Sequence, residues 1–315
     1  MNHGKVSKEI TAGLQALKQR IAAAKVPSSK IDEKLNIASW NIREFGKMRH
    51  SVAAVHYQAE IIGQFDLVGI VELRDDLTDL GRVLQILGPT RRAVYSDMIP
   101  DAGGNRERLG FIFDKRAVTF NGLAAEANPP RTKKGEEYLP GKSFWRSPYL
   151  ALFKSGNFDF VVLTTYIRWG NSNAARLEEI LTLADWIEAK RQEKNSEDKD
   201  LIVMGDFNIP SRTDPCSKPS RNMGCKFPRR CSVSSSAATW KNKRYDQILH
   251  QPIYPDNFTH AGGVLDFHLD EARINELFPA GMTKEKFTFQ LSDLPLRLQI
   301  NTDIDGFKLD EIIQG

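Results

Sequence analysis

The sequence contains little cysteine and lacks long apolar runs. Only Cys216, Cys225 and Cys231 occur among 315 residues, and so few in a chain of this size exclude a disulfide framework and favour a reducing compartment. No stretch approaches the roughly 18 apolar residues that a membrane-spanning helix needs. Residues 1–20 carry charges throughout and contain no apolar run of signal-peptide length. We therefore expect a cytoplasmic protein without a membrane span.

A strong net charge is also lacking, since 44 basic and 40 acidic residues leave +4. That sum hides an uneven distribution: residues 211–245 carry nine basic residues against one acidic residue, a net charge of +8, and the remainder of the chain sums to −4. The three cysteines lie in this segment at spacings unlike the short pairs of zinc ribbons. We expect an irregular loop that either neutralises phosphates beside a site or reflects sequence drift. Of its basic residues, we expect Lys241, Lys243 and Arg244 to face the site, because they stand immediately before the YDQI string.

The apolar pattern predicts one large α/β domain. Apolar residues spaced by three or four indicate an amphipathic helix from Ser7 to about Lys25. Strand-like residues 35–41, a helix over 52–64, a strand over 65–72 and a helix over 76–87 follow in the order that produces parallel strand pairs. Further strands are expected over 91–96, 108–114, 149–155, 158–167, 201–208, 245–250 and 294–300, with a helix around 177–187.

Polar side chains stand where several of these strands end. They are Asn41, Glu72, Asp206 with Asn208, and Asp293. Strand ends in α/β proteins open into a common crevice, which is where sites usually form. Carboxylates and carboxamides without cysteine or histidine make a hard oxygen site suited to Mg²⁺ or Mn²⁺. A single Asp or Asn at the end of a strand is more often a turn or cap residue, because its side chain satisfies backbone donors there.

Taken together, the strings WNIREFG, IVELRDD, NRERLGFIF, GDFN, YDQI and LSDLP resemble the endonuclease/exonuclease/phosphatase superfamily, the deoxyribonuclease I-like proteins. The resemblance runs from about residue 35 to 300. It implies an α/β fold, classed as α+β in some schemes: a four-layer sandwich in which two mixed β-sheets pack face to face and are flanked by helices, with the site at one edge. Residues 1–34 would then be a helix and linker, and 301–315 a tail.

The resemblance also implies roles for individual residues. Asn41 and Glu72 match metal-binding positions, and Asp206 and Asn208 match the pair that orients the attacking water and holds the scissile phosphate. Arg146 matches an arginine that contacts phosphate, a role that suits its forked guanidinium. Glu107 and Asp246 match acidic residues that each support a catalytic histidine in the family. Asp293 matches the aspartate of the closing Ser-Asp-His motif.

Both family histidines are missing. Tyr166 stands where the family has the first, and the closing motif reads Ser292, Asp293, Leu294, Pro295, one residue short of the family pattern. None of the six histidines falls in a motif position; they are His3, His50, His56, His250, His260 and His268. A phenol with a pKa near 10 is a poor base at neutral pH. Loss of one general acid or base costs about 10²–10⁴ in rate.

These observations predict a divalent-metal-dependent phosphodiester hydrolase, a DNA or RNA nuclease with impaired catalysis. Mg²⁺ or Mn²⁺ is the expected cofactor and nucleic acid the expected partner; no protein partner is indicated. Two alternatives stay open. One is a phosphatase or phospholipase of the same fold, because substrate choice lies in the loops. The other is a pseudo-nuclease that binds nucleic acid without hydrolysing it.

Overall fold

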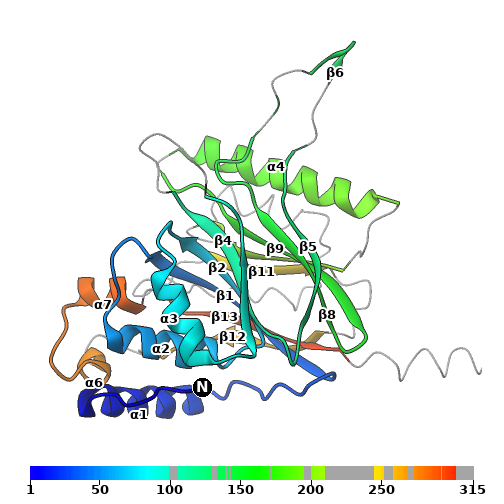
Figure 1. Ribbon diagram of the computed structural model, residues 1–315. Coiled ribbons are helices and arrows are strands. Elements are labelled where there is room, and N and C mark those ends of the chain that lie inside the picture. The colour runs from blue at the N-terminus through cyan, green and yellow to red at the C-terminus, as the bar shows by residue number, and fades with distance from the viewer. Residues whose placement is uncertain are drawn as a thin grey trace, which may run out of the picture.

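The computed structural model describes residues 1–98, 106–129, 133–138, 141, 143–170, 172–194, 200–209, 245–251, 258–267, 273–291 and 293–302. Two mixed β-sheets pack face to face, and helices cover their outer faces (Figure 1). The predicted α/β sandwich is therefore confirmed. The predicted basic loop lies outside the described residues, except for Tyr245 at its end.

The first sheet has six strands in the order β12-β13-β1-β2-β4-β3. Their bounds are β1 (Lys34–Phe45), β2 (Leu67–Leu73), β3 (Arg91–Tyr95), β4 (Arg108–Asp114), β12 (Phe258–Val264) and β13 (Leu296–Asn301). β1 and β2 are parallel, whereas every other neighbouring pair is antiparallel. The parallel pair requires a crossover, and helix α2 (Val52–Ile62) supplies it, as the strand-helix-strand pattern predicts.

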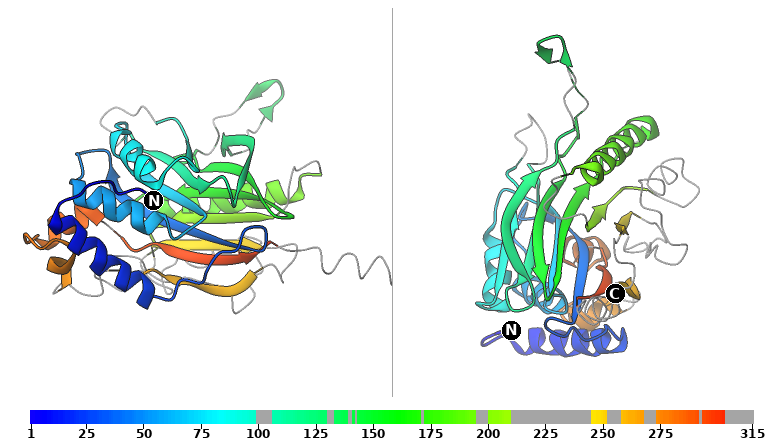
Figure 2. Two further views of the ribbon diagram at one scale, coloured as in Figure 1. Left: turned by 60° about the horizontal axis from the view of Figure 1, so that its bottom comes forward. Right: turned by 90° about the vertical axis from the view of Figure 1, so that its right-hand side faces the viewer.

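The second sheet repeats this plan with five strands in the order β11-β10-β9-β8-β5. Their bounds are β5 (Thr119–Glu126), β8 (Tyr149–Ser155), β9 (Phe158–Tyr166), β10 (Leu201–Asp206) and β11 (Asp246–Gln251). Its parallel pair is β9 with β10, and the crossover contains helix α4 (Asn173–Gln192). A small hairpin of β6 (Lys133–Lys134) and β7 (Glu137–Tyr138) projects from the body of the molecule (Figures 1 and 2). Each sheet thus places one parallel pair between antiparallel neighbours.

Helices cover the two sheets unequally. The first sheet carries α2 together with α1 (Lys8–Ala23), α3 (Thr78–Leu87), α6 (Ile274–Leu277) and α7 (Lys284–Leu291). The second carries α4, which lies on the opposite side of the strands from α1 and α2 (Figure 1). The predicted amphipathic helix is α1, and its Leu14, Leu17 and Ile21 join the core of the first helix layer. Within the described part of the chain, no helix combines the length and apolar character needed to cross a bilayer.

Aromatic side chains fill the space between the sheets. The ring centroid of Phe153 on β8 lies 5.6 Å from that of Phe111 and 5.4 Å from that of Phe113, both on β4. Phe158 and Phe160 on β9 continue the layer with their rings stacked 5.0 Å apart. Such rings contribute large buried apolar areas and favourable edge-to-face contacts. This layer fixes how the two sheets sit against each other.

Six elements were not predicted: β5, β6, β7, β12, α6 and α7. β5 is an edge strand whose residues are half-buried or exposed, and its register shifts between Phe120 and Ala124, so it lacks a clean alternation of apolar and polar residues. β12 contains consecutive glycines, Gly262 and Gly263, which are rare in strand interiors. α6 and α7 are short, at four and eight residues.

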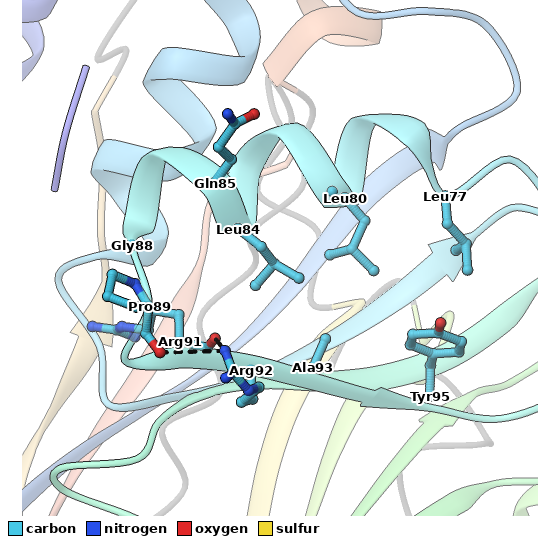
Figure 3. Close-up of a pocket in the computed structure, with 11 residues that line it drawn as sticks. Leu77, Leu80, Leu84, Gln85, Gly88, Pro89, Arg91, Arg92, Ala93 and Tyr95 are labelled. Atoms are coloured by element: carbon cyan, nitrogen blue, oxygen red, sulfur yellow. Dashed lines mark hydrogen bonds between the residues drawn. The ribbon is translucent and has the colours of Figure 1, made fainter. Parts of the chain in front are cut away.

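A surface hollow lies between α3 and β3 (Figure 3). Leu80 and Leu84 of the helix face Ala93 of the strand across it, with Tyr95 at one end. None of the predicted site residues is among those that line this hollow.

Candidate active site

Strand direction brings the predicted residues to one edge of the sandwich. Asn41 and Glu72 lie near the carboxyl ends of the parallel strands β1 and β2, and Tyr166 and Asp206 end the parallel strands β9 and β10. Asp206 is paired in register with Tyr166 on one side and with Asp246, the first residue of β11, on the other. Each sheet therefore contributes half of the cluster.

Glu72 lies at an irregularity in the first sheet that directs its carboxylate toward the second. The register of β2 with β4 shifts between Ile70 and Leu73, and Glu72 has a φ of +60°, uncommon for a residue other than glycine. Oε2 of Glu72 accepts from the backbone N–H of Glu44 at 2.9 Å. Oε1 accepts from Asn41 Nδ2 at 3.0 Å and from the Tyr166 hydroxyl at 2.7 Å. Both carboxylate oxygens are thus held in place.

The GDFN turn at the end of β10 is equally constrained. Gly205 has a φ of +132°, and a Cβ there would collide with the carbonyl oxygen of Thr165 on the neighbouring strand. Asp206 Oδ1 accepts from the Asn208 backbone N–H at 2.8 Å, and Oδ2 accepts from Asn41 Nδ2 at 3.2 Å. The Asn41 carboxamide therefore bridges the carboxylates of the two sheets.

Arg146 and Glu107 lie together beside Tyr166. Arg146 Nε is 2.5 Å from Glu107 Oε2, and its guanidinium carbon lies 4.4 Å from the centroid of the Tyr166 ring. Arg74 Nη1 lies 3.6 Å from Glu107 Oε1. Sequence reasoning missed Arg74, which belongs to the IVELRDD string. Two guanidinium groups therefore flank one buried carboxylate at the edge of the cluster.

The carboxylates repel one another electrostatically. Burial, together with the charges of Asp293 and Glu72, raises the pKa of Asp206 to about 7. Burial, followed by the charges of Asp206, Asp293 and Glu72, raises the pKa of Asp246 well above its usual range. A site with this much negative charge is stabilised by a proton or by a cation.

The donor set fits a hard divalent cation. Asn41 Oδ1 and both carboxylate oxygens of Asp246 are buried and accept no hydrogen bond from the described residues. In that same part of the chain, no three Asp, Glu, His or Cys side chains form a ready-made metal cage. An incomplete cage is compatible with Mg²⁺, which keeps several waters and needs only one or two carboxylates.

Asp293 reaches the cluster from the closing motif. Its backbone carbonyl accepts from the Trp40 indole N–H at 2.6 Å, which ties the start of β13 to the core beside β1. The next residue, Leu294, is buried. The described histidine side chains are engaged elsewhere: His3 contacts His56, His50 contacts Asp79, and His250 stacks on Phe258. His268 lies outside the described residues, as does Ser292.

The start of α4 holds two buried charged residues that sequence reasoning missed. Arg176 donates to the carbonyl oxygens of Asn208 and Gly170, each at 2.9 Å. Glu179 accepts from the backbone N–H groups of Trp145 at 2.9 Å and Arg168 at 3.0 Å. The available signal was a pair of opposite charges three residues apart, next to the apolar stripe of this helix. These two side chains fix the backbone of the loops around the site.

Residues 38–264 match the endonuclease/exonuclease/phosphatase family. The chain therefore belongs to this family. The resemblance inferred from its motifs is confirmed. The roles carried over to individual residues remain predictions that the geometry now makes specific.

Three similar proteins illustrate this relationship. A protein of Thioalkalivibrio sp. (strain K90mix) named Deoxyribonuclease is 31% identical over 199 residues, which are 60% of this chain and 50% of that protein. The chain thus spans about half the length of this curated relative. The human Nocturnin catalytic domain with bound sulfate is 14% identical, with a TM-score of 0.54 over 87% of this chain and 96% of that one. D. rerio TDP2 complexed with single-strand DNA product is 15% identical, with a TM-score of 0.53 over 85% of this chain and 99% of that one. These two structural likenesses concern the fold.

Proposed function

We propose that this chain is a divalent-metal-dependent phosphodiester hydrolase that acts on DNA or RNA. The observation that carries the proposal is the cluster of Glu72, Asp206 and Asp246 from two sheets, with Arg146 beside it. The relative named Deoxyribonuclease and the neighbour complexed with DNA product favour nucleic acid over other phosphoesters. The low cysteine content supports a cytoplasmic location, which is part of the proposal.

In the proposed mechanism, Asn41 and Glu72 would hold Mg²⁺ or Mn²⁺. When bound, such an ion neutralises charge on a phosphate oxygen. Asp206, whose pKa is raised to about 7, takes a proton from the attacking water. Asn208 holds the phosphate beside it, and Arg146 stabilises the negative charge that develops on the phosphoryl oxygens.

The proposal includes slow hydrolysis. Burial and the neighbouring Glu72 carboxylate raise the pKa of the Tyr166 phenol above its ordinary value, so this hydroxyl stays protonated and donates to Glu72. The second family histidine is missing after Asp293, where the closing motif is one residue short and continues directly with Leu294. The described residues thus offer no imidazole to protonate the leaving oxygen.

The test is turnover of bis-nitrophenyl phosphate and of plasmid DNA by the purified chain with Mg²⁺. We expect slow turnover that stops with chelator and in Asp206→Ala. The matched control is Asp159→Ala, which removes a partly exposed carboxylate near the opposite end of β9, paired with Lys154, and should leave the rate unchanged. Faster turnover of inositol phosphates than of DNA and RNA would contradict the nuclease assignment. Tight DNA binding without any turnover would make the chain a pseudo-nuclease.

A further inference from the structure

Two of the most exposed apolar side chains border the candidate active site. Among the described residues, Trp145 is 52% exposed and Trp169 is 63% exposed, whereas Trp40 is buried in the core. Trp145 directly precedes Arg146, and Trp169 follows Tyr166 by three residues. Exposing an indole to water is unfavourable, so large rings placed beside a polar site indicate a binding surface.

These rings take part in two side-chain contacts, whose four residues we call the aromatic platform: Trp145, Arg168, Trp169 and Tyr245. The Arg168 guanidinium lies over the Trp145 ring, 4.7 Å from its centroid. The Trp169 ring meets the Tyr245 ring edge to face, with centroids 5.6 Å apart. Arg168 and Trp169 are consecutive residues, so the two contacts adjoin.

The platform is held rigidly against the candidate active site. The buried Glu179 carboxylate accepts from the backbone of both Trp145 and Arg168, which fixes these two residues next to each other. Arg176 ties Gly170, the residue after Trp169, to the carbonyl oxygen of Asn208. Tyr245 directly precedes Asp246, and its carbonyl oxygen accepts from Phe207 N–H at 2.8 Å. Each platform residue is thus anchored to a site residue or to a loop that carries one.

We infer that the aromatic platform stacks unpaired bases of a single-stranded nucleic acid whose phosphate is held at Arg146. This inference rests on the proposed function and narrows its substrate. Indole rings and a stacked guanidinium offer planar faces that every base can use, without sequence preference. In a duplex those base faces are covered by neighbouring pairs, so single strands and unpaired ends are favoured over intact duplex.

The test is equilibrium binding of fluorescently labelled single-stranded DNA to the full chain without Mg²⁺, so that no cleavage occurs. Trp145→Ala and Trp169→Ala should each weaken binding by about 5- to 150-fold, the effect of losing one stacked base. Trp145→Phe and Trp169→Phe keep an aromatic face and should weaken binding by less than about fivefold. The matched control is Ile31→Ala, a change at an equally exposed apolar residue in the loop before β1.

An oligonucleotide with abasic sites throughout separates base stacking from phosphate contacts. The alanine variants should bind it as the unchanged chain does. An equal loss for abasic and natural strands, or no loss for either, would overturn the inference. Displacement of the strand by a monosaccharide phosphate that also requires both tryptophans would assign the platform to sugar rings and overturn it as well.

This outcome is separable from the proposed function. If the chain binds single strands through both tryptophans but hydrolyses no diester with Mg²⁺, the platform stands and the proposed hydrolysis fails. If it hydrolyses diesters while the alanine variants bind strands unchanged, the hydrolysis stands and the platform fails.

Discussion

The Tyr166 hydroxyl in the second sheet donates a 2.7 Å hydrogen bond to Oε1 of Glu72 in the first. Both residues are buried, and the bond joins the last residue of β9 to the irregular end of β2. It therefore does two things at once: it holds a carboxylate expected to bind metal, and it fastens the two sheets where they form the site.

Replacement of Tyr166 by phenylalanine should destabilise the protein more than an ordinary lost hydroxyl. Hydrogen bonds to charged groups contribute about 1.5–3 kcal/mol, against about 0.5–1.5 kcal/mol for neutral ones. The matched control is Tyr57→Phe, since the Tyr57 hydroxyl donates to a neutral acceptor, the carbonyl oxygen of Leu277, at 2.6 Å. Urea unfolding of the metal-free protein measures both changes in the free energy of unfolding. Equal losses would contradict a special contribution from the bond to Glu72.

Restoring both histidines should accelerate hydrolysis. Tyr166→His combined with insertion of a histidine after Asp293 recreates the family motifs, and one general acid or base supplies about 10²–10⁴ in rate. The two groups act as a unit, so each change alone should give much less than the pair. Plasmid cleavage with Mg²⁺ measures the rate. A rate unchanged in the combined variant, shown by its melting curve to be folded, would argue against impaired catalysis.

Arg176→Met should lower turnover although Arg176 is buried beneath the site. It leaves the buried carbonyl oxygen of Asn208 without its donor, at a cost of about 1–3 kcal/mol, and it removes the partly buried bond to Gly170. The GDFN turn is then free to move. We expect a fall in kcat of about tenfold or more, because small displacements of positioned groups are costly. Arg191→Met on the same helix is the control, since its ion pair with Glu188 is partly exposed and should change stability by less than about 1 kcal/mol.

The metal-free protein should become less stable as pH rises toward 8. The pKa values of Asp206 and Asp246 are raised in the folded state. Above about pH 4 the folded state therefore still binds protons that the unfolded state has released. The free energy of unfolding then falls as pH rises through the folded pKa values. His50 and His56 act in the opposite sense, since burial lowers the pKa of each. The Asp246→Asn variant keeps both histidines, so the difference in stability between the unchanged chain and this variant is free of their contribution.

Calorimetry at pH 5 to 8 with chelator provides this comparison. The melting temperature of the unchanged chain should drop relative to that of Asp246→Asn as pH rises, because the variant lacks one of the buried charges. Parallel curves for the two proteins would show that Asp246 does not titrate in this range.

The predicted strand order accounts both for most of the fold and for where the structure brings the candidate site residues together. Asn41 and Glu72 lie near the carboxyl ends of their strands, and Asp206 ends its strand. The order of these strands implies parallel pairs, and the carboxyl ends of parallel strands meet at one edge. Contacts between the sheets could not be predicted, because local spacing does not say which sheet faces which. The bond from Tyr166 to Glu72 is one of these contacts.

Other features were hidden for local reasons. The positive φ of Glu72 depends on a shift in strand register, which side-chain periodicity does not reveal. Arg176 and Glu179 are indistinguishable in sequence from the solvated charges that most helices carry, because only burial separates the two cases. The cofactor, and any role of residues 211–244, remain predictions.

The phenylalanine layer between the sheets influences the geometry of the candidate site, although its rings are not part of that site. Phe111 belongs to the sheet that holds Glu72, and Phe153 to the sheet that holds Asp206. The size of these rings therefore sets the distance between the two sheets, and with it the distance between Glu72 and Asp206 in the candidate site. Replacing one of these phenylalanines by a smaller or larger side chain would change that distance, although the substituted residue lies away from the candidate site. The geometry of the candidate site can accordingly change through substitutions in the interior, without any substitution at the surface.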